Sequence, residues 1–107
     1  MNISTEDNAL LELLMEGCTS DKRYKRLPKD VVRGYIKAVN HLKAAKRIED
    51  LFKVGSLHYE RLHGKRKDFE SIRCTGRWRL IFKSSSIDNS VVITEIQLIE
   101  ISNHYDD

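Results

Sequence analysis

The 107-residue chain has few of the features that mark a secreted, metal-binding or membrane protein. Its two cysteines, Cys18 and Cys74, form no CxxC pair and have no second cluster beside them, which argues against a metal site. No apolar run approaches the roughly 20 residues that cross a membrane, and no basic segment followed by an apolar one opens the chain. We therefore expect a single domain over residues 1–107, located in the cytoplasm, with no disulfide, metal or small-molecule cofactor.

Positive charge is absent from both ends of the sequence. The first 20 residues contain four acidic residues and the last 24 contain five, and neither segment has a lysine or an arginine. All 19 Lys and Arg residues lie between Lys22 and Lys83. This basic middle segment predicts a polyanionic partner, bound with an affinity that falls as salt rises. The competing interpretation is that the charges cover solvated helix faces, above all at Lys37, Lys43 and Lys46.

Helical spacing dominates the first half of the chain. Asn2–Ser4 is a candidate edge strand, and Thr5 is the candidate N-cap of a helix with Glu6 and Asp7 in its first turn and Gly17 at its end. A second helix is expected to begin at Pro28, because apolar residues then recur at helical spacing. These are Val32, Tyr35, Ile36, Val39 and Leu42.

Strand patterns dominate the second half. Residues 48–55 predict a short helical turn that Gly55 ends, and a brief extended segment should follow at residues 57–62. Three strands are expected over Phe69–Cys74, Trp78–Lys83 and Val91–Ile99. The third changes its apolar phase between Ile93 and Ile96, which favours a bulge or burial on both faces. Two helices on a small, mainly antiparallel twisted sheet form an α+β fold.

The turn between the first two of these strands sets the positions of two arginines. A two-residue Thr75-Gly76 loop would mix polar and apolar residues on each face, whereas a three-residue loop with Gly76 at positive φ pairs Cys74 with Trp78. Ile72 then pairs with Leu80 on one apolar face, and Arg73 lies opposite Arg79 on the other. Facing like charges destabilise a sheet by up to about 1 kcal/mol. Either a bound anion or neighbouring carboxylates such as Glu70 or Glu95 would offset that cost.

The stretch from Leu57 to Ser85 resembles the killer-protein (HigB-like) branch of the RelE/ParE superfamily, which comprises toxins of bacterial toxin–antitoxin and plasmid-maintenance systems. The pattern appears here as Leu62, Gly64, Arg66 and Lys67, then Ser71-Ile72-Arg73, then Trp78-Arg79-Leu80-Ile81-Phe82, with an ending similar to "SNHY". Asp68 stands where many members have glycine. The tail order Asn103-His104-Tyr105 differs from the usual Asp-Tyr-His, so either His104 or Tyr105 could take the functional position.

This resemblance implies a ribosome-dependent mRNA endoribonuclease, neutralised by a DNA-binding HigA-like antitoxin, that uses no metal. A ribose 2′-hydroxyl would attack the adjacent phosphate, with Arg73 and Arg79 stabilising the transition state and His104 or Tyr105 transferring protons. The residues expected to bind RNA are His63, Lys65, Arg66, Lys67 and Arg77. Two other functions stay open: a ParE-like gyrase inhibitor that cuts nothing, and a non-catalytic RNA-binding module.

Overall fold

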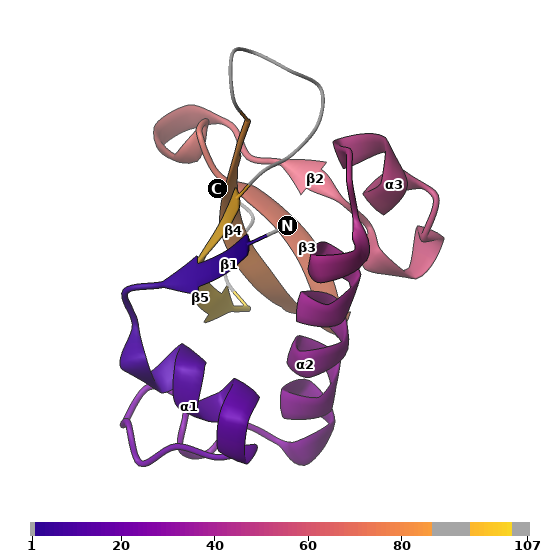
Figure 1. The fold of residues 1–107 in the computed structure, drawn as a ribbon. Coiled ribbons are helices and arrows are strands. Elements are labelled where there is room, and N and C mark those ends of the chain that lie inside the picture. The colour runs from indigo at the N-terminus through magenta and orange to yellow at the C-terminus, as the bar shows by residue number, and fades with distance from the viewer. Residues whose placement is uncertain (1, 87–94, 104–107) are drawn as a thin grey trace.

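The computed structural model describes residues 2–86 and 95–103, and within them it has a five-stranded sheet with helices on one face. The elements are β1 (Asn2–Thr5), α1 (Asn8–Glu16), α2 (Lys29–Ala44), α3 (Ile48–Phe52), the 3-10 turn η1 (Gly55–Leu57), β2 (Glu60–Arg61), the 3-10 turn η2 (Gly64–Arg66), β3 (Glu70–Thr75), β4 (Trp78–Ser85) and β5 (Glu95–Ser102). The strand order is β1-β5-β4-β3-β2. Figure 1 shows α1 and α2 packed against the sheet and α3 at the far end of α2. This is the α+β fold that the sequence predicts.

The sheet is mixed because its N-terminal edge strand is parallel to its neighbour. β1 pairs in parallel with β5, while β2, β3, β4 and β5 pair antiparallel along the rest of the sheet. The predicted edge strand is therefore confirmed, one residue longer than expected. Among the described residues, no helix is both long enough and apolar enough to span a bilayer.

The core lies between the two long helices and one face of the sheet. Alternate strand residues supply the sheet side, as period-2 geometry requires. The predicted stripe of α2 supplies much of the helix side, with Tyr35, Val39 and Leu42 fully buried. The strand residues that belong to this core are Ile72, Leu80, Phe82, Ile96, Leu98 and Ile101.

Helix α1 begins later than the sequence suggests. Asp7 is the N-cap, and its Oδ1 accepts a hydrogen bond from the Ala9 backbone N–H at 3.0 Å. Thr5 instead ends β1, donating its hydroxyl to the Leu98 carbonyl at 3.0 Å and accepting from the Asp7 N–H at 3.1 Å. The prediction of Thr5 as N-cap and of Glu6 and Asp7 in the first turn was therefore wrong, because strand pairing extends through Thr5. Gly17 ends α1 at φ +75°, as predicted.

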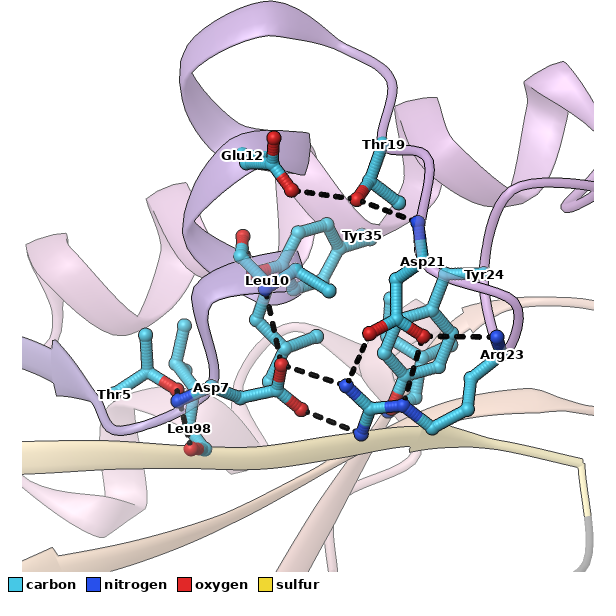
Figure 2. Close-up of polar contacts among 12 residues, drawn as sticks. Thr5, Asp7, Leu10, Glu12, Thr19, Asp21, Arg23, Tyr24, Tyr35 and Leu98 are labelled. Atoms are coloured by element: carbon cyan, nitrogen blue, oxygen red, sulfur yellow. Dashed lines mark hydrogen bonds and ion pairs between the residues drawn. The ribbon is translucent and has the colours of Figure 1, made fainter.

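Arg23 lies in the basic segment between α1 and α2 and binds two carboxylates. One belongs to Asp7, the N-cap of α1, and the other to Asp21, two residues before Arg23. Its Nη1 and Nη2 donate to the two Asp7 oxygens at 2.7 and 2.9 Å, and its Nε donates to Asp21 Oδ1 at 3.0 Å. Figure 2 shows the guanidinium lying between the two carboxylates. The hydrogen bonds from Arg23 hold the pKa of Asp7 below its ordinary value. This arginine therefore has a structural role.

Helix α2 approaches β3 closely at Gly34. A Cβ built there would lie 2.3 Å from the Cys74 carbonyl oxygen, closer than any real Cβ contact. Ala38, one turn along the same helix, is also buried. Small residues on this side of α2 therefore set the spacing between helix and sheet.

β5 contains a bulge near its C-terminal end. The register between β4 and β5 shifts between Ile81 and Phe82, which pair with Glu100 and Leu98 and leave Ile99 as the extra residue. The predicted phase change falls partly on residues 87–94, which lie outside the described residues. The bulge keeps Leu98 and Ile101 on the buried face while Glu100 faces the other side.

We predict that Gly34→Ala lowers the free energy of unfolding by about 1–3 kcal/mol, the usual cost of overpacking, because the new methyl group meets rigid backbone at Cys74. Gly55→Ala is the matched control, since nothing lies within 4 Å of a Cβ built there. Urea denaturation of both variants measures the difference. Equal stabilities for the two variants would contradict the close approach.

We predict that Arg23→Gln lowers stability by at most about 1 kcal/mol at neutral pH, the range for exposed ion pairs. Because the pKa of Asp7 is depressed in the folded protein, this stabilisation is complete above the unfolded pKa of about 3.9 and disappears as the pH falls through the folded value. Urea denaturation between about pH 2 and pH 7 tests this, with Arg26→Gln in the same exposed segment as control. A stability difference that persists at the lowest pH would refute the assignment.

Candidate functional site

The β3–β4 hairpin places two arginines directly opposite each other. Arg73 pairs with Arg79, and Ile72 pairs with Leu80, so both of these predictions are confirmed. The predicted pair of Cys74 with Trp78 was wrong: Thr75 pairs with Trp78, and the register shift leaves Cys74 as a bulge. A two-residue loop of Gly76 and Arg77 thus preserves the arginine register, with Gly76 at φ +56°.

We call the sheet face turned away from α1 and α2 the outer face. Leu80 and Phe82 point into the core, so the alternate residues of β4, Arg79, Ile81 and Lys83, point to the outer face. Ser71 pairs with Ile81 from β3, and Glu100 pairs with Ile81 from β5, so both point to this face as well.

Arg79 is buried on this face, with only 4% of its surface exposed. Its Nε donates to the Ser71 hydroxyl at 2.8 Å, and its Nη2 donates to the carbonyls of Ser71, at 3.3 Å, and of His58. Arg73 is only partly buried. The two arginines therefore differ: Arg79 is held by neighbouring groups, and Arg73 is the more accessible.

Of the two carboxylates suggested as neutralising neighbours, Glu70 lies elsewhere. It pairs with Phe82 on the core side, is 2% exposed, and accepts hydrogen bonds from the Tyr59 hydroxyl at 2.6 Å and the Ser84 hydroxyl at 2.6 Å. Burial, reinforced by the hydrogen bond to Glu70, raises the pKa of Tyr59. Placing Glu70 beside the arginines was therefore wrong, because Glu70 shares the side of Ile72, two residues along β3.

The segment between β2 and β3 folds onto the outer face, as the salmon-coloured turn beyond the strands shows in Figure 1. Arg66 forms an ion pair with Glu100. Its guanidinium carbon lies 5.5 Å from the Phe69 ring centroid, and Lys83 Nζ lies 4.9 Å from the same centroid. Two cations thus flank one aromatic ring on this face. His63, Lys65 and Lys67 of the same segment are exposed.

His58 contributes to this site, although the sequence analysis did not single it out. It adopts φ 45° and ψ 54°, the left-handed region that is uncommon for any residue with a side chain. Its backbone carbonyl, rather than its imidazole, contacts Arg79. No residue-type pattern identifies a carbonyl ligand, although Ser71 could have been noted because it precedes Ile72-Arg73 in the motif.

The remaining predicted site residues lie at the ends of this region. Ser102, the last residue of β5, pairs with Arg79. His104 and Tyr105, the candidates for proton transfer, follow two and three positions later and lie outside the described residues. Arg77 is exposed in the hairpin loop and makes no part of the cluster around Arg79 that the structure describes.

A separate cavity of about 280 Å³ lies at the β3 edge of the sheet, between α2, η1 and β3. Its polar lining residues are Lys37, His41, Ser56, Arg73 and Thr75. Cys74 also lines it, and burial raises the pKa of that thiol to about 12, which keeps it protonated and unreactive. Arg73 is therefore common to the hairpin pair and to this cavity.

Comparison with known proteins identifies the family and supports the fold. A family model described as the RelE-like toxin of the type II toxin–antitoxin system HigB matches residues 10–98. No curated protein matches the sequence. A YoeB/ParE toxin from Agrobacterium tumefaciens has a similar fold, with a TM-score of 0.55 and 16% identity over 98% of this chain and 100% of that one.

The family match covers most of the chain, including α2, the hairpin and the basic segment between β2 and β3. The solved neighbour independently supports the fold, although its identity is too low to carry a function. A type II system pairs its toxin with a cognate antitoxin, so this protein has such a partner. The chain belongs to the HigB-like family of RelE-like toxins from type II toxin–antitoxin systems.

Proposed function

We propose that this toxin is a ribosome-dependent mRNA endoribonuclease that stops translation until a HigA-like, DNA-binding antitoxin neutralises it. The observation that supports this most directly is the register of β3 and β4, which brings Arg73 and Arg79 side by side. Two adjacent guanidinium groups suit the phosphate of an RNA strand, because their planar forks match its oxygens and stay charged at any working pH.

The reaction needs stabilisation of charge that develops on the phosphate as the 2′-hydroxyl attacks. We assign Arg73 to direct phosphate contact because it is the more accessible of the pair. Arg79 would supply a second charge, held in place by Ser71 and His58 before substrate arrives. Such preorganised charge costs no rearrangement during the reaction. A substrate anion bound beside the two arginines would relieve their mutual repulsion, and this relief would favour binding.

Proton transfer is assigned to the tail of the chain. His104 would act as acid or base, with Tyr105 sharing that role or stacking on an unpaired base. Both follow closely after Ser102, the strand partner of Arg79.

The exposed His63, Lys65 and Lys67, together with Arg66 and Arg77, would hold the RNA backbone. Phe69, flanked by Arg66 and Lys83, offers an aromatic surface among these charges. The whole arrangement would work as one domain in the cytoplasm.

We predict that Arg73→Ala lowers mRNA cleavage by about 10²- to 10³-fold, the usual loss when one stabilising donor is removed from a transition state. The measurement is induction in bacteria, following growth and mapping new mRNA 5′ ends on translating ribosomes. Lys46→Ala, an exposed position just after α2, is the matched control and should cut as the unmodified protein does. Growth arrest without new ends would refute the nuclease and favour a gyrase inhibitor.

We predict that Arg79→Ala lowers the free energy of unfolding by at least about 2 kcal/mol, because it removes charged hydrogen bonds to the buried Ser71 and to the partly buried His58 carbonyl. Loss of toxicity in that variant would then report folding as well as chemistry. Urea denaturation of Arg79→Ala and Arg73→Ala separates the two effects. Unchanged stability in Arg79→Ala would show that its hydrogen bonds contribute little.

A further inference from the structure

We infer that the cavity at the β3 edge of the sheet binds a backbone phosphate of RNA, at a position beside the proposed nuclease site and distinct from it. This inference rests on the proposed function in so far as RNA is the substrate. The cavity lies on the helix side of the sheet edge, whereas the basic segment that contains Arg66 folds onto the outer face.

The cavity gathers polar and cationic groups from α2 and from η1. Lys37 and His41 lie one turn apart on α2, so their side chains occupy the same flank of the helix. Ser56 lines it from η1 with a hydroxyl group, and Arg73 borders it from β3, with a side chain that shares the face of Arg79. A permanent cation, an imidazole and a hydroxyl, supplied by Lys37, His41 and Ser56, are groups that proteins use to hold phosphate oxygens.

The space exists because of two local features. β2 pairs only with Glu70 and Ser71, so the rest of β3 lies beyond the end of its edge strand. On the opposite side, Ala38 lines the cavity with a short side chain, whereas at Gly34 the helix packs directly against the Cys74 backbone. The resulting 280 Å³ is several times the roughly 30 Å³ that one water molecule occupies, which is enough for a phosphate group.

The charge of the lining selects an anion. None of the described residues that line this cavity is acidic. A second cavity, near the start of α1, is lined by Glu6, Asp7 and Asp21 as well as Arg23. Arg23 there is already bound to carboxylates, whereas Lys37 is exposed.

An RNA phosphate fits better than an isolated carboxylate because Arg73 belongs both to this lining and to the hairpin pair. A strand whose scissile phosphate contacts Arg73, beside the buried charge of Arg79, would place a neighbouring phosphate around the edge of the sheet, against Lys37 and His41. The cavity would thereby fix the register of the RNA relative to the hairpin, as phosphate contacts do without reading sequence.

The test measures binding of a short, fluorescently labelled single-stranded RNA by anisotropy at several KCl concentrations. We expect Lys37→Ala to weaken binding several-fold at low salt and to reduce the slope of log affinity against log salt by about 0.7, the value for one lost phosphate contact. Lys37 is exposed, so this variant should fold. Lys37→Arg should restore the slope, because the cation is retained.

The matched control is Lys43→Ala, on the same helix but lining a different, largely apolar cavity. A slope that falls equally in Lys37→Ala and Lys43→Ala would reveal a diffuse basic field and overturn the site. The site would also be overturned by an unchanged slope in Lys37→Ala or by absence of RNA binding in the unmodified protein. If an acidic antitoxin peptide binds the protein and Lys37→Ala abolishes that binding without changing RNA binding, the cavity binds a protein carboxylate instead.

Ribosomal cleavage assays of the same proteins separate this inference from the proposed function. If the unmodified protein cuts mRNA while Lys37→Ala keeps its full salt slope, the nuclease stands and the cavity does not. If RNA binding depends on Lys37 while no mRNA is cut, the cavity stands and the nuclease does not.

Discussion

The burial of the Arg79 guanidinium is the constraint on which the outer face depends. A charge with 4% exposure is tolerable only when its donors are paired, and here Ser71 and the His58 carbonyl accept from it. Those contacts tie β4 to β3 and to the turn after η1. His58, whose carbonyl accepts one of these hydrogen bonds, adopts the left-handed backbone conformation, which costs free energy in a residue other than glycine.

The ion pair of Arg66 with Glu100 performs a similar task on the other side of the outer face. It joins the segment between β2 and β3 to β5, over the fully buried Ile81. The basic segment between β2 and β3 is thus anchored by one of its own arginines. Its lysines, Lys65 and Lys67, are exposed.

The basic middle of the chain therefore serves two purposes. Arg23 binds Asp7 and Asp21, and Arg66 and Arg79 have the partners described above, so these three arginines stabilise the fold. Arg73 and Lys37 line a cavity without acidic lining among the described residues. Net charge alone cannot separate these groups, since the difference lies in which carboxylate or carbonyl each one reaches.

Local patterns in the sequence were sufficient for the fold class, the α2 stripe and the pairing of Arg73 with Arg79. Hydrophobic periodicity and a glycine that permits positive φ are properties of neighbouring residues, so they can be read without coordinates. The details that failed, the Thr5 cap and the Cys74 pair, depended on how far a strand continues.

Only the tertiary structure decided that Arg79 is buried, that Glu70 lies on the core side, and that Arg73 shares a cavity with Lys37 and His41. Arg79 and His58 are 21 residues apart, and Arg66 and Glu100 are 34 apart. The sequence by itself determined which residue types stand on each strand and helix. The tertiary fold decided which distant residues these side chains contact. Such contacts depend on how segments pack together, and they leave no periodic pattern in the local sequence.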